Sequence, residues 1–235
     1  MIIAANFKTN LTRKATKSYL SAVDTYLGES GASQKAMVFP PFTAFDDYET
    51  QAILGAQNAY ATQNGAYTGE IGLDQLDEFG IKTILIGHSE RRHVLGETQE
   101  SIAQKFDYFV EQGFEIVYCI GEPLEVREEG NDALMSYLDA QLEGIDLMYE
   151  KLIIAYEPVW AIGTGLTPTM SDIELIHTSL KTKFTKPLLY GGSVKATTSK
   201  EILALDNVDG VLVGSGALDV NDFISMLKDA EALTQ

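Results

Sequence analysis

Short apolar runs alternate with amphipathic segments along the whole chain, and this alternation restricts the possible folds more than any other feature. The runs are IIAANF, AMVFPP, ILGAQN, TILIGH, EIVYCIG, LIIAYEP, PLLYGG and GVLVGSG. Continuous apolar runs of this length are typical of strands buried on both faces, as in parallel sheets. We therefore expect a strand at each run and a helix in most of the intervening segments.

Three intervening segments carry apolar residues at helical spacing. Their apolar positions are Ile102, Phe106, Phe109 and Val110; Leu134, Tyr137, Leu138, Leu142 and Ile145; and Val220, Phe223, Ile224 and Leu227. About eight strand and helix units without a Pro- or Ser-rich linker favour a closed (β/α)8 barrel over an open doubly wound sheet. We predict an α/β fold, a TIM barrel that forms one domain over residues 1–235.

The chain is strongly acidic, with 34 Asp and Glu against 17 Lys and Arg and a formal net charge of -17. This charge disfavours general attraction to nucleic acid or to an anionic membrane, so an anionic ligand must be held by local donors. The single cysteine, Cys119, excludes an intrachain disulfide, and the start MIIAANF resembles no leader or membrane span. We expect a cytoplasmic protein that needs neither zinc nor a nucleoside triphosphate, because motifs for both are missing from the sequence.

Polar residues and Gly-rich turns stand at the ends of several of the expected strands. They are Asn6 and Lys8 after the first run, His88 after the fourth, Glu157 after the sixth, Gly191–Ser193 after the seventh and Gly214–Gly216 after the eighth. In a barrel, the carboxyl ends of the strands meet at one rim, where such enzymes carry their chemistry. We expect these groups to converge there.

Glu157 lies in the stretch AYEPVWAIGTG, between an apolar run and a proline. A surface glutamate at a strand end is the simpler interpretation. However, Trp160 and Ile162 follow and can exclude water, and Gly163 and Gly165 give the backbone freedom to fold over the acid. A carboxylate covered in this way becomes basic enough to remove a carbon-bound proton.

His88 and Lys8 each have a structural and a functional interpretation. A lone histidine is usually structural, but His88 stands at an expected helix start, where the helix dipole disfavours imidazolium and a neutral ring can donate to an oxyanion. Most lysines are solvated surface charges, but Lys8 follows the apolar run IIAANF and alternates with Asn6 on one strand face. Glu90 is the expected counter-ion of Lys8.

The remaining motifs are weaker signals. YGGS and VGSG can be simple tight turns, but after the seventh and eighth strands of a barrel such loops commonly bind phosphate through backbone N–H groups. Arg91, Arg92 and Glu97 are expected to form a buried ion-pair network that shapes the loops. Cys119 is expected to be a packed thiol with a raised pKa rather than a nucleophile.

Taken together, NFK, AQN, NGAYTGEI, GHSERRHVLGE, CIGE, YEPVWAIGTG, YGGSV and GVLVG closely resemble the triosephosphate isomerase family, in its order, from Asn6 to about Leu218. The resemblance implies interconversion of dihydroxyacetone phosphate and D-glyceraldehyde 3-phosphate through an enediolate, without metal or organic cofactor. The residues alone indicate a phosphorylated small molecule and a proton transfer, and they leave the substrate open.

The resemblance also implies roles for individual residues. Glu157 is the base, His88 the neutral electrophile, and Lys8 and Asn6 complete the polar site. Residues 158–168 form a lid with its hinge, in which Trp160 belongs to the cover. The phosphate donors are Gly163, Ser193, Gly214 and Ser215, and Tyr190 and Ser193 latch the closed lid. Residues 56–71 insert into a second copy in a homodimer, where Thr68 touches the partner's site.

The chain departs from the family pattern at three places. NFKTN replaces the usual Asn-Trp-Lys-Met-Asn, and Gly214-Ser215 replaces Gly-Gly, so we predict a negative φ for Ser215 that keeps its N–H available. Leu166, Thr167 and Pro168 replace the usual Lys-x-Ala type hinge, which predicts a stiffer far hinge.

Two other functions remain as alternatives to the isomerase. One is a non-catalytic sugar-phosphate-binding barrel, which would not need the acid and base pair, and the other is another phosphate-handling barrel enzyme.

Overall fold

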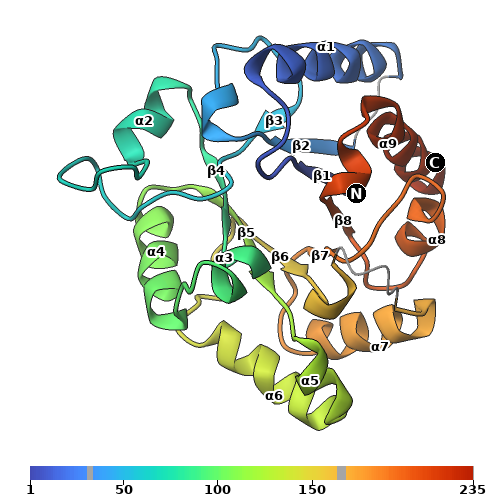
Figure 1. The fold of residues 1–235 in the computed structure, drawn as a ribbon. Coiled ribbons are helices and arrows are strands. Elements are labelled where there is room, and N and C mark those ends of the chain that lie inside the picture. Colours follow the sequence, from blue (N-terminus) through green and yellow to red (C-terminus); the bar gives the residue numbers. More distant parts are fainter. Residues whose placement is uncertain (31–33, 163–167, 235) are drawn as a thin grey trace.

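The protein is a barrel of parallel strands surrounded by helices (Figure 1). The computed structural model describes residues 1–30, 34–162 and 168–234. The strands are β1 (Ile2–Asn6), β2 (Lys35–Phe39), β3 (Ile53–Leu54), β4 (Thr83–Ile86), β5 (Glu115–Ile120), β6 (Leu152–Tyr156), β7 (Leu188–Tyr190) and β8 (Gly210–Val213). Seven of them fall within the predicted apolar runs and β2 begins one residue before its run, so the predicted fold class is confirmed.

The strands pair in the order β3-β2-β1-β8-β7-β6-β5-β4, and every pairing is parallel. Ala56, just beyond β3, closes the ring against β4 through a single bridge to Ile84. There the Ala56 N–H donates to Thr83 O at 2.8 Å, and the Leu85 N–H donates to Ala56 O at 2.8 Å. The carboxyl ends of all the strands therefore share one rim.

Helices cover the outside of the strands (Figure 1). They are α1 (Arg13–Ser30), α2 (Leu73–Glu78), α3 (Ser89–His93), α4 (Gln99–Glu111), α5 (Leu124–Glu128), α6 (Asn131–Leu142), α7 (Met170–Lys181), α8 (Ser199–Leu203) and α9 (Val220–Thr234). Short 3-10 turns lie at η1 (Phe42–Ala44), η2 (Val159–Ala161) and η3 (Ser215–Ala217). All three turns lie just beyond the carboxyl ends of strands, namely β2, β6 and β8.

Alternate strand residues point to two separate apolar layers. In β5, Val117 and Cys119 belong to the smaller cluster inside the barrel, while Ile116, Tyr118 and Ile120 pack outward against the helices. Because both faces are buried, the strands read as continuous apolar runs.

The predicted helical faces are largely confirmed, since Ile102, Phe106 and Phe109 of α4 are fully buried. One assignment was wrong. Ile145 is buried but lies beyond the end of α6 at Leu142, because the chain leaves helical geometry at Glu143.

Candidate active site

A cavity of about 640 Å³ opens at the carboxyl ends of the strands. The sequence-predicted residues that line it are Asn6, Lys8, His88, Glu157, Ser193, Gly214 and Ser215. They come from the ends of β1, β4, β6, β7 and β8. The expected convergence on one rim is therefore present, and it joins the titratable side chains to the Gly-rich turns.

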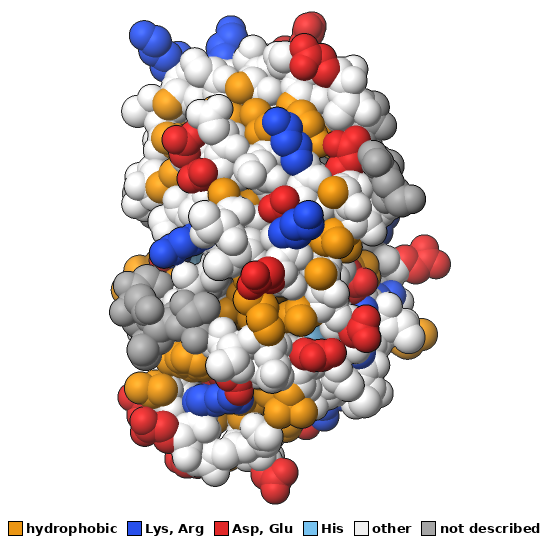
Figure 2. Space-filling model, turned by 90° about the vertical axis from the view of Figure 1, so that its right-hand side faces the viewer, with side chains coloured by type: hydrophobic (Ala, Val, Ile, Leu, Met, Phe, Trp, Pro, Cys, Tyr) orange, Lys and Arg blue, Asp and Glu red, His pale blue; other side chains and the backbone are white. Residues whose placement is uncertain are grey.

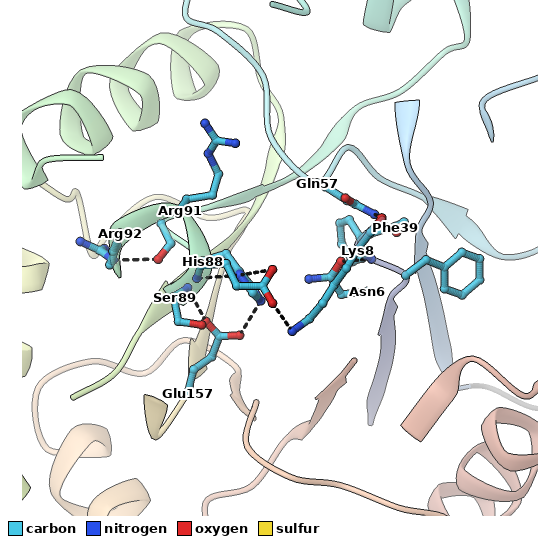
Figure 3. Close-up of polar contacts among 12 residues, drawn as sticks. Asn6, Lys8, Phe39, Gln57, His88, Ser89, Arg91, Arg92 and Glu157 are labelled. Carbon is cyan, nitrogen blue, oxygen red and sulfur yellow. Dashed lines mark hydrogen bonds and ion pairs between the residues drawn. The ribbon is translucent and has the colours of Figure 1, made fainter. Parts of the chain in front are cut away.

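Glu157 follows β6 directly and points toward His88 (Figure 3). Its side chain is only 3% exposed, and its Oε1 lies 3.1 Å from Nε2 of His88. Its Oε2 accepts a hydrogen bond from the Ser89 N–H at 3.1 Å, at the start of α3. Gly191 leaves room for this carboxylate, because a Cβ there would stand 2.7 Å from Cγ of Glu157. In this arrangement both carboxylate oxygens are held by the His88–Ser89 turn.

These contacts set the protonation of the pair. Burial alone raises the pKa of Glu157, but His88, the Ser89 N–H and Lys8 outweigh it and lower the pKa below its ordinary value. Burial alone lowers the pKa of His88, but the adjacent Glu157 outweighs it and raises the pKa. The two shifts correct the sequence expectation, which gave Glu157 a raised pKa and His88 a neutral ring without regard to their contact with each other.

One contact of His88 still favours the neutral ring. Its Nδ1 accepts the backbone N–H of Glu90 at 3.2 Å, inside the first turn of α3. A ring nitrogen that accepts a hydrogen bond carries no proton, so the proton of the neutral ring lies on Nε2, facing the cavity. The raised pKa therefore depends on Glu157 staying where it is.

Lys8 reaches the cavity from a position that sequence reasoning described incompletely. It lies beyond the end of β1 rather than in the strand, with a left-handed φ of 52°. Its N–H donates to Oδ1 of Asn6 at 3.0 Å, and Nε2 of Gln57 donates to Lys8 O at 2.8 Å. Its Nζ pairs with Glu90 at 2.6 Å, which is the expected counter-ion. Bonds on both sides of the backbone hold the ammonium at the rim.

Gln57 and Glu122 support the site, and the sequence analysis gave neither a role. Gln57 also donates to Phe39 O at 2.8 Å, so it joins the ends of β1 and β2 (Figure 3). Glu122 is fully buried and accepts from Trp160 Nε1 at 2.8 Å and from Tyr156 Oη at 3.0 Å. Burial is the largest influence on Glu122 and raises its pKa. Both residues lie in motifs that carry the family resemblance, AQN and CIGE, and these motifs were the sequence signal that could have identified them.

The turns after β7 and β8 form the other side of the cavity. Gly214 has a φ of -86°, and Ser215, which begins the 3-10 turn η3, is not among the described non-glycine residues with a positive φ. The predicted backbone conformation of Ser215 is therefore confirmed. The Gly216 backbone packs so closely on Val194 O that a Cβ there would overlap it. Gly163, the remaining predicted phosphate donor, lies outside the described residues, as do Leu166 and Thr167 of the hinge.

Tyr190 ends β7 and is fully buried. Among the described residues, its hydroxyl has no hydrogen-bond partner. The hydroxyl lies against Gly192, where an added Cβ would overlap it. An unpartnered buried hydroxyl costs free energy, so a donor or acceptor that arrives from elsewhere would gain from contacting it.

Thr68 does not line the cavity of its own chain. It is exposed on the segment 56–71, which projects from the barrel between β3 and α2 (Figure 1). Tyr60 and Tyr67 of this segment stack at 4.4 Å between ring centroids and remain 39% and 45% exposed.

The expected ion-pair network is only partly present. Arg91 and Lys105 pair with Glu97 at 2.6 and 2.8 Å, but Arg92 binds Gly87 O and Gln99 instead.

Cys119 is buried inside the barrel, and burial raises the pKa of its thiol, as predicted. Within the described ranges, no three His, Cys, Asp or Glu side chains gather as metal ligands would. None of the described helices combines the length and apolar character that crossing a membrane requires.

The barrel and its cavity define an enzyme of the (β/α)8 class, with a buried carboxylate and imidazole facing backbone turns suited to an anion. The family model described as triosephosphate isomerase matches residues 1–230. Proteins of that name from Sulfurimonas denitrificans and Sulfurovum sp. are each 60% identical, over 98% and 97% of this chain and 96% and 99% of their own lengths. Another from Nitratiruptor sp. is 51% identical over 99% of this chain and its full length. The chain belongs to the triosephosphate isomerase family.

Proposed function

We propose that this chain interconverts dihydroxyacetone phosphate and D-glyceraldehyde 3-phosphate by proton transfer through an enediolate. The observation that carries the proposal is the contact of Glu157 with His88 in the cavity that the β7 and β8 turns complete. The family membership and the names of the relatives support the choice of substrate.

Glu157 is the base. It removes the proton from the carbon next to the carbonyl group of one triose and returns a proton to the neighbouring carbon. Its oxygens are occupied by His88 and Ser89 in this arrangement, so substrate binding has to break both contacts. Once they are broken, burial is the main remaining influence and raises the pKa of Glu157, which makes the carboxylate more basic.

His88 and Lys8 stabilise the negative charge that develops on the substrate oxygens. When Glu157 leaves Nε2, the largest cause of the raised pKa of His88 is gone, and burial and Lys8 then lower the pKa. The neutral ring donates its Nε2 proton to the enediolate oxygen, and the Lys8 ammonium adds a fixed positive charge. Asn6 holds the Lys8 backbone in place.

The phosphate group lies against the β7 and β8 turns, where Ser193, Gly214 and Ser215 donate backbone N–H groups, joined by Gly163. Residues 158–168 act as the lid. Trp160 and Glu122 hold its near end, and the unpartnered Tyr190 hydroxyl, with Ser193, latches the closed form. Pro168 stiffens the far hinge.

The protein works as a homodimer in the cytoplasm. The projecting segment 56–71, with exposed Tyr60 and Tyr67, supports the dimer because exposed aromatic side chains are enriched in interfaces. Thr68 would reach the partner's cavity from this segment. Sedimentation equilibrium should give twice the chain mass, 51.4 kDa from two chains of 25.7 kDa. A Tyr67→Asp variant should shift toward monomer, and a monomeric parent would contradict the assembly.

The test of function is a coupled assay that follows conversion of D-glyceraldehyde 3-phosphate. The parent protein should turn over, and Glu157→Asp should lower kcat by about 10²-fold or more, because the shorter side chain misplaces the base. Binding of the triose phosphate without turnover by the parent would favour the non-catalytic sugar-phosphate-binding barrel instead.

A further inference from the structure

The cavity carries two cations and two carboxylates among its described lining residues, apart from His88. They are Lys8, Lys195, Glu157 and Asp222. Lys8 is already compensated by Glu90 at 2.6 Å, and Glu157 is held by His88 and Ser89. The charges of Lys195 and Asp222 therefore remain without an explanation from these contacts.

Both of these side chains belong to exposed residues. No ion pair with another described residue involves either of them. Lys195 is thus the uncompensated cation of the cavity, and Asp222 is the uncompensated carboxylate. Their fields act on whatever enters the cavity rather than on a fixed partner.

The fold places each charge beside one of the two Gly-rich turns. Lys195 stands two residues after Ser193, and its backbone is fixed by Thr198, whose Oγ1 accepts the Lys195 N–H at 3.2 Å and whose own N–H donates to Lys195 O at 3.0 Å. Asp222 lies in the first turn of α9, just beyond η3. Because the backbone is fixed, each charge stays near its turn, and only the motion of its own side chain changes the distance between them.

The rest of the molecule works against an anionic substrate, since the formal net charge is -17. The face that includes α8 and α9 shows acidic side chains interspersed with basic ones and no broad basic area (Figure 2). A local cation at the cavity therefore offsets part of this repulsion.

We propose that Lys195 draws the phosphorylated substrate into the cavity and that Asp222 opposes it, so that this pair adjusts the rate of substrate capture. The inference rests on the proposed function, because it takes the dianionic triose phosphate as the ligand. Neither side chain takes part in the proton transfer. One unit charge about 10 Å from a dianion in water changes the association constant about threefold at 0.01 M salt, and most of that is screened at 0.15 M.

The experiment compares kcat/KM for D-glyceraldehyde 3-phosphate at about 0.01 M and 0.15 M ionic strength. Lys195→Gln should lower kcat/KM about threefold at low salt, Lys195→Glu about tenfold, and Asp222→Asn should raise it about threefold, with smaller effects at high salt. The control is Lys17→Gln, which removes one exposed cation from α1, outside the cavity lining. It should change kcat/KM much less.

Titration with inorganic phosphate, followed by NMR shifts of the cavity amides, supplies a readout that needs no turnover. Affinity should follow the same order across the variants. The proposal is overturned if Lys195→Gln matches Lys17→Gln, or if its effect on kcat/KM is independent of salt. A parent protein without isomerase activity would overturn the proposed function instead, while the phosphate titration would still test Lys195.

Discussion

The two sides of the cavity are built from different parts of the chain. One side consists of side chains from β1, β4 and β6, namely Asn6, Lys8, His88 and Glu157. The other consists mainly of backbone, in the turns Gly191–Ser193 and Gly214–Gly216. Each side chain of the first side has a hydrogen bond or ion pair that orients it, whereas the second side depends on the space that glycine leaves.

The difference predicts how each side tolerates change. On the side-chain side, a substitution removes a charge or a proton donor that the proposed reaction needs, so we expect the barrier to rise. On the backbone side, a substitution matters only where a Cβ has no room or where φ is positive. Ser215 shows that a side chain is accepted when it points to solvent and φ is negative.

The largest effect is expected for Glu157→Gln. The amide keeps the size of the side chain but cannot accept the carbon-bound proton, so kcat should fall roughly 10⁴-fold, the upper range for loss of a general base. Steady-state kinetics measure kcat, and inorganic phosphate affinity serves as the control, since it should change less than about threefold. Retention of more than a tenth of the activity would mean that another group is the base.

Lys8→Met should follow, with a loss of about 10³-fold in kcat/KM. In the proposed mechanism the ammonium interacts more strongly with the enediolate than with the ground state, so both kcat and kcat/KM should fall. Glu90→Gln is the matched control, because it removes only the counter-ion at 2.6 Å and leaves the cation. A Lys8→Met enzyme of near-normal activity would contradict its place in the site.

His177 of α7 packs outside the barrel against the ends of β6 and β7, and it predicts a pH effect on stability. Its ring contacts Tyr156 and Tyr190 at 5.9 and 6.2 Å between centroids, and its Nδ1 lies 3.0 Å from Asn207 O. Burial lowers its pKa to about 4, below the ordinary value of 6.5. The unfolded chain therefore binds a proton that the folded chain does not. The free energy of unfolding should fall by roughly 3 kcal/mol between pH 6.5 and pH 4, and the loss from His177 should level off below pH 4.

Urea unfolding at fixed protein concentration, at pH 7 and pH 4, measures this loss of stability. In His177→Gln the share due to the imidazole should disappear, so the variant should lose less stability on acidification than the parent. Equal losses in the two proteins would show that His177 is not held neutral by burial. His177→Asn provides a second variant in case the glutamine does not fit.

The smallest effect is expected for Ser215→Gly, on the backbone side. The N–H proposed to contact phosphate is kept, and the exposed hydroxyl makes no hydrogen bond to another described residue, so kcat/KM should stay within about twofold. Gly216→Ala is the contrast, because its Cβ would overlap Val194 O and force the turn to move. If the serine variant lost as much activity as the alanine variant, the backbone account of this side would fail.

The sequence predicted the side-chain side well because chemistry depends on residue identity. Buried strands need continuous apolar runs, so the eight runs predicted the barrel, and Asn6, His88 and Glu157 at the ends of three runs predicted the rim. The reaction and its substrate came only from the resemblance, because a carboxylate, an imidazole and Gly-rich turns suit many phosphate-handling barrels.

What the sequence could not predict were contacts between distant residues. The Glu157 contact with His88 joins residues on β6 and β4 and reverses the expected direction of both pKa shifts in this arrangement. The left-handed backbone of Lys8 is held by Gln57, which is 49 residues away. The place of Lys195 and Asp222 at one cavity likewise needs the closed barrel, since 27 residues separate them in the chain.

The central claim is that Glu157 moves a carbon-bound proton through an enediolate stabilised by His88 and Lys8. Isomerisation in D₂O, followed by ¹H NMR, tests it most directly, because an enediolate route lets the carboxyl proton exchange with solvent. We predict that the triose formed carries solvent deuterium at the newly protonated carbon, and that Glu157→Gln abolishes this incorporation. Rapid isomerisation with no deuterium in the product would contradict the account.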